Sequence, residues 1–358
     1  MVGVRPWAIF LGGVVLAAIF QLVVTSTFGD SAAMLQVGQK SYARPFIEAE
    51  LGDDIPTFPD FGHDGQLSYI VARRPFGGEG IDVLESAAFR YRRWLYPALA
   101  GGFGTFSPRG TVLGLAVWAA IGFGLAAAAL VVIGETYGVR SRLLALGVYL
   151  NIGLILSTMI VTSDALGMGL ALAGVAAYRK DHRLPAVGLL AAASLTKEQF
   201  LVFSIAVAID AWMAGDRKSA VGFLLLPLGV VAGASVLAVR AFGGSGGLNS
   251  NITVPLAGIL DASDGWASAY VTLRRATYLT LIGLVLVGPL AVWTRERLII
   301  LLSVGWMAGA VLAAELVWRE GTDSLRVFAS FWPLIALSIA IGFGRSHRRR
   351  QSSSIAVG

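Results

Sequence analysis

The chain lacks cysteine altogether and carries little charge for its 358 residues. The absence of cysteine excludes a disulfide framework, a thiolate metal site and a cysteine nucleophile. Charged residues make up 14% of the chain, whereas an ordinary soluble domain has roughly a quarter. Hydrophobic residues make up 56%. A soluble protein of this composition would expose large apolar patches, so the sequence predicts an integral membrane protein.

The positive net charge does not indicate a nucleic-acid partner. The formal charge is +6, but the basic residues lie in short loops between apolar segments. That distribution is typical of basic residues that set the orientation of membrane helices. We therefore expect membrane lipids and no nucleic acid among the partners.

Apolar segments long enough to enter a bilayer recur along the whole chain. Because about 20 apolar residues cross a membrane as a helix, the sequence predicts an all-α fold, a polytopic transmembrane helical bundle of about ten helices. One transmembrane domain is expected over 1–344, followed by a basic, disordered tail at 345–358. The predicted segments are 8–27, 111–133, 142–161, 164–178, 184–195, 199–214, 219–241, 276–293, 298–317 and 327–344.

Two of these assignments have alternatives. The run 8–27 is longer than the apolar core of a typical signal peptide and has no clear cleavage site, so we interpret it as an uncleaved first helix rather than a cleaved signal. The stretch 184–214 is interpretable as one long helix. Basic clusters flank it on both sides, however, and both clusters favour the cytoplasm, which predicts two short helices with a turn at 196–198.

The charges of the loops predict the orientation of the chain. The loop 28–110 contains ten acidic and eight basic residues. The segments predicted to face inward contain four acidic residues against 14 basic ones, which are Arg5, Arg140, Arg142, Arg179, Lys180, Arg183, Arg217, Lys218, Arg295, Arg297, Arg345, Arg348, Arg349 and Arg350. Cytoplasmic loops are rich in Lys and Arg. We therefore expect both termini in the cytoplasm and the loop 28–110 outside.

The loop 28–110 is too long to be a plain connection. Its residues His63, Asp64 and Gly65 predict a turn into a short helix over 66–72, with Asp64 as a possible N-cap. A second amphipathic stretch at 81–100 interleaves Arg with Tyr and Trp. This pattern favours the lipid headgroup layer, either as a simple anchor or as a site where Arg binds a lipid phosphate.

Charged residues are also predicted at the outer ends of the membrane segments. Asp164 lies in the turn between the third and fourth segments, Lys197 and Glu198 between the fifth and sixth, and Arg326 before the tenth. Ionisable groups at membrane depth usually face a polar cavity or a partner. We expect them to meet Asp64 in one cavity, and the plain structural alternative is that Lys197 neutralises Glu198 or Asp164.

Motifs for other chemistries are missing from the sequence. It has no Gly-rich phosphate loop and no Gly-x-Ser-x-Gly elbow. The three histidines, His63, His182 and His347, do not form a metal-ligand pattern, so no metal site is predicted. A divalent cation shared by Asp60, Asp64 and Glu198 stays open as an alternative.

Four short motifs resemble the GT-C superfamily, whose members are polytopic glycosyltransferases that use polyprenyl-phosphate sugars. GHDGQLSY at 62–69 and RYRRWLYP at 90–97 resemble the YDGQFYY and YRYRRILYP patterns of uncharacterised bacterial GT-C-like membrane proteins. TSDAL at 162–166 and LTKE at 195–198 are similar to the SDA and TKE turns of the same group. The resemblance covers most of the chain.

The resemblance implies roles for particular residues. A first-loop carboxylate is the catalytic base in that superfamily, and Asp64 stands at the matching position. The resemblance also implies a polyprenyl-phosphate-linked sugar as donor and an extracytoplasmic glycan or lipid as acceptor, in a bacterial cytoplasmic membrane. Many members have paired acids in this loop, whereas Asp60 and Asp64 are separated here. The residues expected to bind the donor phosphate are Arg92, Arg93, Lys197 and Arg326, and those expected to support the site are His63, Gln66, Asp164 and Glu198.

Two other functions remain as alternatives to the glycosyltransferase. A transporter or flippase for a lipid-linked or anionic solute would show repeat symmetry and broken helices in corresponding halves, and the sequence has no clear internal repeat. The other alternative is a non-catalytic membrane scaffold, in which the charged turns would have no catalytic role.

Overall fold

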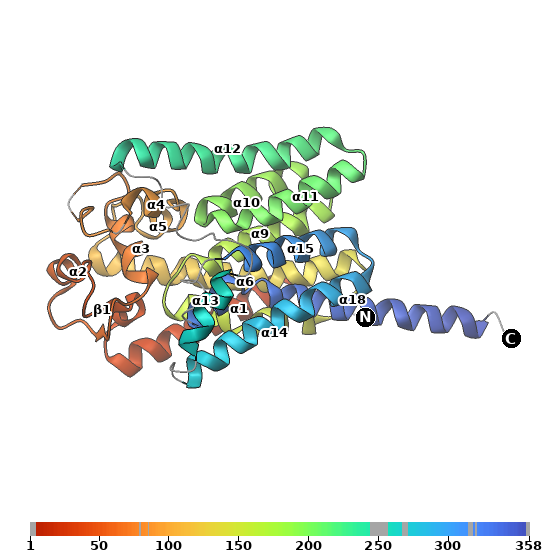
Figure 1. The fold of residues 1–358 in the computed structure, drawn as a ribbon, viewed down its shortest axis with the longest axis horizontal. Helices are drawn as coiled ribbons and strands as arrows, with labels where there is room; N and C mark the ends of the chain where they lie inside the picture. Colours follow the sequence, from red (N-terminus) through yellow and green to blue (C-terminus); the bar gives the residue numbers. More distant parts are fainter. Residues whose placement is uncertain are drawn as a thin grey trace.

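The structure is a computed structural model that describes residues 5–78, 80–84, 86–243, 257–266, 271–313, 318 and 321–355. The described residues form helices and one pair of two-residue strands. Figure 1 shows the long helices side by side, with the elements of the loop 28–110 gathered at one end and both chain termini towards the other. The all-α fold predicted from the sequence is confirmed.

The helices of the bundle lie on both sides of the loop 28–110 in the sequence. Those before residue 200 are α1 (Pro6–Phe28), α6 (Pro108–Thr136), the 3₁₀ helix η2 (Arg142–Ala145), α7 (Leu146–Tyr149), α8 (Ile152–Met159), α9 (Asp164–Arg179), α10 (Arg183–Thr196) and η3 (Glu198–Phe200). Those that follow are α11 (Leu201–Met213), α12 (Arg217–Phe242), α13 (Ala257–Trp266), α14 (Val271–Thr294), α15 (Arg297–Leu312), α17 (Gly321–Val327) and α18 (Phe331–Ile355).

Among the residues that the structure describes, four helices are long and apolar enough to cross a membrane, namely α1, α6, α12 and part of α14. Most of the apolar segment of α6 is buried, whereas α1, α12 and α14 expose most of theirs. Exposed apolar side chains are therefore concentrated on the outside of the bundle, for example Leu224, Leu225 and Leu237 on α12. Such a surface is stable in lipid and not in water.

The count of about ten complete spans is not reproduced. The predicted segment 142–161 is a pair of helices bent by 60° at Asn151, and counting that pair as one span gives five at most. The segments predicted at 164–178, 184–195, 199–214 and 298–317 are helices of 13 to 16 residues. At 1.5 Å per residue they are about 20–24 Å long, shorter than the roughly 30 Å hydrocarbon layer.

The last predicted segment also differs from expectation in its extent. The apolar part of α18 covers Phe331–Arg345, and the helix continues to Ile355. The tail expected to be disordered is therefore helical over its described part.

Small residues let α6 and α9 pack closely at the centre of the bundle. A Cβ atom added at Gly122 of α6 would lie 2.3 Å from Cα of Leu166, and one added at Gly169 of α9 would lie 2.4 Å from the carbonyl oxygen of Gly122. Glycine at these positions is required by the close approach of the two backbones. The contact fixes the start of α9, where Asp164 lies.

The loop 28–110 folds into a layer of short elements. They are η1 (Ser31–Leu35), β1 (Val37–Gly38), α2 (Arg44–Leu51), β2 (Thr57–Phe58), α3 (Asp64–Arg73), α4 (Ala87–Tyr91) and α5 (Leu95–Ala100). The strands β1 and β2 pair in parallel. The amphipathic stretch 81–100 contains the two short helices α4 and α5. The hydrophobic core of the layer includes Tyr69, Ile70 and Tyr96.

Tyr96 attaches this layer to the bundle. Its buried hydroxyl lies 2.9 Å from the carbonyl oxygen of Leu115 on α6 and 2.8 Å from that of Val161, in the turn between α8 and α9. The first loop is therefore positioned directly against the turn that carries Asp164.

Candidate active site

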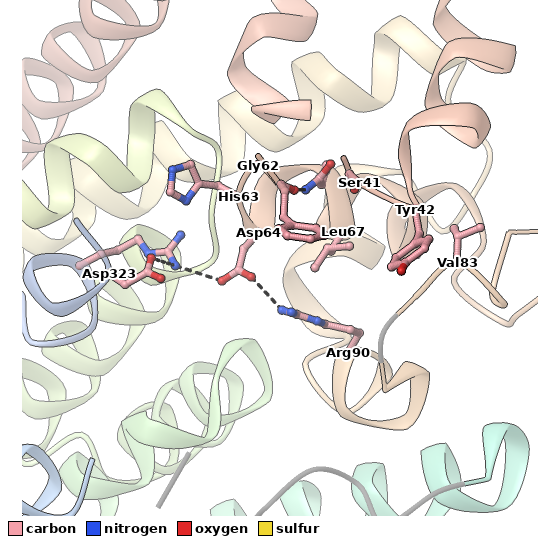
Figure 2. Close-up of a pocket in the computed structure, with 12 residues that line it drawn as sticks. Ser41, Tyr42, Gly62, His63, Asp64, Leu67, Val83, Arg90 and Asp323 are labelled. Atoms are coloured by element: carbon pink, nitrogen blue, oxygen red, sulfur yellow. Dashed lines mark hydrogen bonds and ion pairs between the residues drawn. The ribbon is translucent and has the colours of Figure 1, made fainter. Parts of the chain in front are cut away.

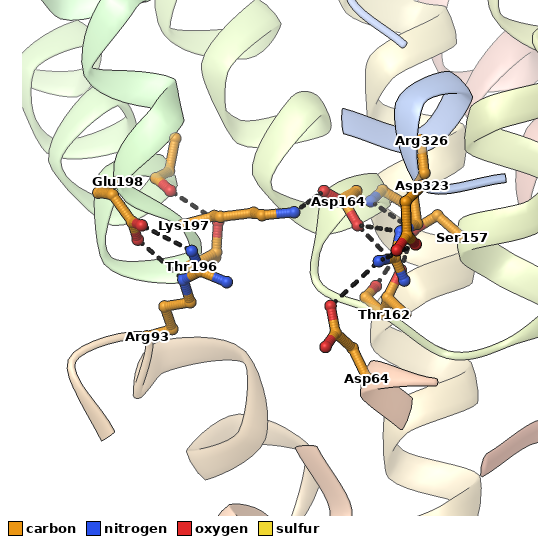
Figure 3. A network of polar contacts seen from close by, with 12 residues as sticks. Asp64, Arg93, Ser157, Thr162, Asp164, Thr196, Lys197, Glu198, Asp323 and Arg326 are labelled. Carbon is orange, nitrogen blue, oxygen red and sulfur yellow. Dashed lines mark hydrogen bonds and ion pairs between the residues drawn. The ribbon is translucent and has the colours of Figure 1, made fainter. Parts of the chain in front are cut away.

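Nine charged side chains from four parts of the chain meet where the first-loop layer covers the bundle. They come from the first loop, the α8–α9 turn, the α10–α11 turn and α17 (Figure 3). The nine residues, here called the charged cluster, are Asp64, Arg90, Arg92, Arg93, Asp164, Lys197, Glu198, Asp323 and Arg326. All seven charged site residues predicted from the sequence belong to it.

Asp64 opens α3 and joins two cations. Its Oδ1 lies 2.8 Å from Nη1 of Arg90, and its Oδ2 lies 3.1 Å from Nη2 of Arg326. The N-cap position belongs to His63, so the interpretation of Asp64 as an N-cap is wrong. Its carboxylate, about one third exposed, is instead held between the first loop and α17.

Buried side chains of the first loop present Asp64 in this position. The buried amide of Gln66 accepts a hydrogen bond from the backbone N–H of Gly38 and donates one to the carbonyl of Phe61. Gly62, next to Phe61, has a positive φ of 72°, a conformation that glycine adopts without strain. Gln66 was expected to support the site, and its contacts are with the backbone that leads into α3.

Asp164 and Lys197 form the most deeply buried pair of the cluster. Nζ of Lys197 lies 2.6 Å from Oδ1 of Asp164, and the two side chains are only 7% and 2% exposed. The hydroxyl of Thr162 lies 3.0 Å from the other carboxylate oxygen, Oδ2. The structural alternative stated for Lys197, neutralisation of Asp164, is thus its observed contact, and Glu198 has other partners.

Arg326 connects three carboxylates. Its Nη2 donates to Asp64 and, at 2.9 Å, to Asp323, while its Nε lies 3.4 Å from Oδ2 of Asp164. The side chain is 96% buried, since only 4% of its surface is exposed. Among the residues that the structure describes, Nη1 of this guanidinium has no hydrogen-bond partner. A buried donor without a partner is costly, so it indicates a place for an anionic or polar ligand.

Arg92 and Arg93 share the carboxylate of Glu198. Arg93 binds it with two hydrogen bonds, of 2.8 Å from Nε and 2.6 Å from Nη2, and Nη2 of Arg92 lies 2.6 Å from Oε1. Both guanidinium groups also lie 4.1–4.2 Å from the ring centre of Phe89. One carboxylate facing two cations leaves this corner of the cluster positive.

The cations keep the carboxylates ionised. Burial alone would raise the pKa of Asp64, but the charges of Arg90, Arg326 and Lys197 outweigh it and hold that pKa well below its usual value. Burial opposes ionisation of Glu198 in the same way, and its hydrogen bonds and charge contacts with Arg93 and Arg92 lower its pKa. Both groups therefore carry a negative charge at neutral pH.

A cavity of about 480 Å³ opens beside the cluster. Its lining includes charged side chains of the cluster, which are Asp64, Arg90, Arg92, Arg93, Lys197, Glu198 and Arg326. It also includes apolar side chains, which are Leu201 and Val202 of α11, Val231 of α12, and Trp306 and Leu312 of α15. This space, here called the amphiphilic cavity, therefore offers both charged and apolar contacts to a ligand.

A second cavity, of about 290 Å³, lies on the first-loop side of Asp64. Figure 2 shows Asp64 between Arg90 and Asp323, with Tyr42 on the other side of this space. His63 and Gln66 line it, as does Asp64 itself. We call it the polar cavity. Its wall shares Asp64, Arg90, Asp323 and Arg326 with the amphiphilic cavity.

Sequence reasoning placed most of these residues but missed three features. Asp164 was expected to line a cavity with Asp64, Lys197 and Arg326, but it lies behind the wall, paired with Lys197. Arg90 and Asp323 were not assigned roles, although both contact the central pair of Asp64 and Arg326. The position of Arg90 in the RYRRWLYP motif was an available signal for it, and the charge of Asp323 three residues before Arg326 was one for Asp323.

The alternative of a shared divalent cation is not supported by the geometry. Asp60 lies away from the cluster on the surface, with its carboxylate 2.8 Å from Nζ of Lys40. Glu198 is already bound by Arg92 and Arg93. In the described ranges, no three His, Asp or Glu side chains are grouped so that they could hold a metal ion.

Comparison with known proteins adds no family to this description. No family model, curated protein or solved structure matches the chain.

Proposed function

We propose that the chain is a GT-C-like glycosyltransferase that moves a sugar from a polyprenyl-phosphate donor to an extracytoplasmic acceptor. The observation that supports this most is the position of Asp64. Its carboxylate stands on the wall between an amphiphilic cavity and a polar cavity, with two guanidinium groups attached to it. A base placed between a lipid-binding space and a polar space is what sugar transfer from a lipid carrier requires.

The amphiphilic cavity fits the donor in both shape and charge. Its apolar lining residues suit an isoprenoid chain, and its charged lining residues suit a phosphate. The cluster contains five cations and four carboxylates, which leaves one positive charge. A sugar linked to a lipid by one phosphate carries one negative charge, so binding would neutralise the cluster. Nη1 of Arg326 supplies a donor that has no protein partner among the described residues.

The proposed reaction uses the charged cluster for both proton removal and stabilisation of charge. A hydroxyl oxygen of the acceptor attacks the anomeric carbon of the donor sugar, and the bond from that carbon to the phosphate oxygen breaks. The electron pair leaves with the polyprenyl phosphate, and Asp64 takes the hydroxyl proton. The leaving phosphate gains negative charge, which the cations of the site stabilise.

Donor binding would also make Asp64 a better base. The neighbouring cations hold the pKa of Asp64 low despite its burial, and a carboxylate with a low pKa accepts a proton weakly. A phosphate bound to Arg326 or Arg90 offsets their charge and raises that pKa. Asp64 would therefore become a more effective base once the donor phosphate is bound.

The membrane arrangement belongs to the same proposal. The shorter helices α9, α10, α11 and α15 would complete a bundle of about ten segments, with recessed outer ends that form the floor of the site. In a bacterial cytoplasmic membrane both termini would be cytoplasmic and the first-loop layer outside.

An assay with purified protein tests the proposal. The protein in lipid nanodiscs is incubated with a panel of polyprenyl-phosphate sugars and with saccharide and lipid acceptors, and both glycosylated product and free polyprenyl phosphate are measured. Transfer by the wild type and its loss in Asp64→Asn support the proposal. Transfer by both proteins, or by neither, removes the support for Asp64 as the base.

A transporter or flippase for a lipid-linked solute is the second candidate. The bent pair of α7 and α8, with the side chain of Asn151 bound 2.8 Å from the carbonyl of Ala329, is a feature that transporters use. Movement of a labelled lipid-linked sugar across proteoliposomes without formation of a glycosylated product would favour this function. A scaffold would give neither movement nor transfer.

A further inference from the structure

The polar cavity differs from the amphiphilic cavity in the elements that form it. Its lining comes from the first-loop layer, with Asp323 and Arg326 of α17 at one side. The four helices long enough to cross a membrane, α1, α6, α12 and α14, contribute no residue to it. The amphiphilic cavity, in contrast, is lined by α12 as well as α11 and α15. Among the described residues, the polar cavity is therefore lined without any side chain from the long apolar helices, whereas α12 contributes to the amphiphilic cavity.

The groups around the polar cavity suit a neutral molecule with many hydroxyls. Ser41, Tyr42 and His63 offer a hydroxyl, a phenol and an imidazole, and Asp64 faces the same space. Such a mixture donates and accepts hydrogen bonds without a large net charge. The volume of about 290 Å³ is near the lower limit of roughly 300 Å³ for ligand pockets. It accommodates one or two sugar units rather than a long chain.

Two exposed aromatic rings stand at this cavity. The side chains of Tyr42 and Phe61 are 65% and 58% exposed although both belong to the first-loop layer and line the space beside Asp64. Aromatic faces carry partial negative charge and pack well against the positively polarised C–H edges of other groups. The faces of pyranose and furanose rings present such C–H groups, whereas their edges carry the hydroxyls.

We propose that the polar cavity binds the acceptor and that the acceptor is a carbohydrate that arrives from water, not a lipid. The terminal sugar packs on Tyr42 and Phe61, and its reacting hydroxyl points to Asp64. This inference rests on the proposed glycosyltransferase function and narrows its acceptor from a glycan or lipid to a glycan. It also separates the two substrates in space, with the donor reaching Asp64 from the membrane side.

Binding of saccharides without any donor provides the test. The protein in nanodiscs, free of glycoside detergents, is mixed with neutral trisaccharides of glucose, mannose, galactose and arabinose, and binding is measured by saturation-transfer NMR. We expect at least one trisaccharide to bind, and binding to fall at least fivefold in Tyr42→Ala and Phe61→Ala. Tyr42→Phe keeps the ring and is expected to retain most of the binding.

Phe76→Ala is the matched control. Phe76 is an aromatic side chain of the same first-loop layer, 78% exposed, and it lines neither cavity. We expect it to bind trisaccharides like the wild type, and a circular-dichroism melt verifies that each variant is folded. Equal binding by folded Tyr42→Ala, Phe61→Ala and wild type would overturn the proposal, as would the absence of binding by every trisaccharide.

The outcome is distinguishable from that of the proposed function. Sugar transfer to lipid acceptors alone would leave the glycosyltransferase in place and refute the carbohydrate acceptor. Trisaccharide binding that depends on Tyr42 and Phe61, with no transfer from any donor, would support this site and refute the proposed reaction.

Discussion

Nη2 of Arg326 lies 3.1 Å from Oδ2 of Asp64, although 262 residues separate them in the chain. The contact closes the site, because it joins the first-loop layer to α17 near the other end of the sequence. Arg326 is almost completely buried, and its remaining contacts are with Asp164 and Asp323. One guanidinium thus fixes the position of the proposed base and faces both proposed substrates.

Asp64→Asn is expected to lower the rate of sugar transfer about 10²- to 10⁴-fold, the usual contribution of a general base. An amide keeps the shape of the side chain but cannot accept the hydroxyl proton. Donor binding, measured with a fluorescent polyprenyl-phosphate sugar, is expected to persist because the amide leaves the cations in place.

Asp60→Asn is the matched control for this variant. Asp60 lies four residues earlier in the same loop, but its carboxylate pairs with Lys40 on the surface and lines neither cavity. We expect transfer within about twofold of the wild type, since exposed pairs contribute little. A similar loss in both variants would mean that Asp64 acts through the fold of the loop.

Arg326→Lys is expected to weaken donor binding about 10- to 100-fold, which corresponds to the loss of one hydrogen bond between charged groups. The planar guanidinium of Arg326 offers several N–H donors that can contact Asp64, Asp323 and a phosphate together. A lysine ammonium is a compact point charge without this planar arrangement of donors. The KM for the donor measures the effect. Arg297→Lys, in the pair with Asp210 on α11, is the control and is expected to leave this KM unchanged.

Lys197→Met is expected to destabilise the protein by about 3–5 kcal/mol, because it leaves the buried carboxylate of Asp164 without its closest cation. The double variant Lys197→Met with Asp164→Leu is expected to be more stable than Lys197→Met alone. Unfolding in detergent, monitored by circular dichroism, provides the free energies of unfolding for the wild type, the two single variants and the double variant, which together form a double-mutant cycle.

Lys40→Met tests whether burial of the ion pair causes the loss of stability expected for Lys197→Met. Lys40 and Asp60 form a pair at 2.8 Å, but their side chains are 65% and 74% exposed. This variant is expected to change stability by about 0–1 kcal/mol. Equal losses in Lys40→Met and Lys197→Met would contradict the account of the Asp164 pair.

The grouping of the charged side chains was more predictable than the number of membrane-spanning helices, for a physical reason. A charge at membrane depth needs a partner, so Asp164, Lys197, Glu198 and Arg326 were expected to meet. The presence of charged residues between apolar segments is visible in the sequence, so this expectation needs no knowledge of the fold. Which charges pair depends instead on distances between helices, and the sequence therefore did not indicate that Glu198 binds Arg92 and Arg93 rather than Lys197.

Helix geometry was less predictable than helix position. Apolar runs located most of the bundle helices, although no predicted segment covers α13 and only the last residue of α17 lies in one. The run 142–161 did not reveal the bend at Asn151. The bend depends on a tertiary contact, because the side chain of Asn151 binds the distant carbonyl of Ala329 as well as the N–H of Leu154. The short lengths of α10 and α11, in contrast, agree with the segments predicted at 184–195 and 199–214.

Acid is expected to destabilise the protein through Asp64 and Glu198. Both pKa values are lowered in the fold because neighbouring Arg side chains outweigh the effect of burial. A carboxyl with a lowered folded pKa stabilises the protein fully above its unfolded pKa, near 4, and the effect is lost as pH falls through the folded value. We expect the Tm to fall steadily below about pH 4.

Glu198→Gln tests the source of this acid sensitivity. It removes one of the two titrating groups and leaves Arg92 and Arg93 without their carboxylate. We therefore expect a lower Tm at pH 7 and a shallower fall below about pH 4. A pH profile parallel to that of the wild type would show that Glu198 does not contribute.

Labelling of single introduced cysteines reveals the membrane orientation on which the proposed function depends. The chain has no native cysteine, so the unmodified chain gives no background labelling. Asp53 is exposed in the first-loop layer, and Asp181, 82% exposed, lies in the turn between α9 and α10. In intact cells an impermeant maleimide is expected to label Asp53→Cys and not Asp181→Cys, and lysis should expose both. Labelling of Asp181→Cys alone in intact cells would place the charged cluster in the cytoplasm. The basic loops would then lie outside the cell, against the usual charge asymmetry of membrane proteins. Sugar transfer would have to take place on the cytoplasmic face, and that result would remove the basis for an extracytoplasmic acceptor.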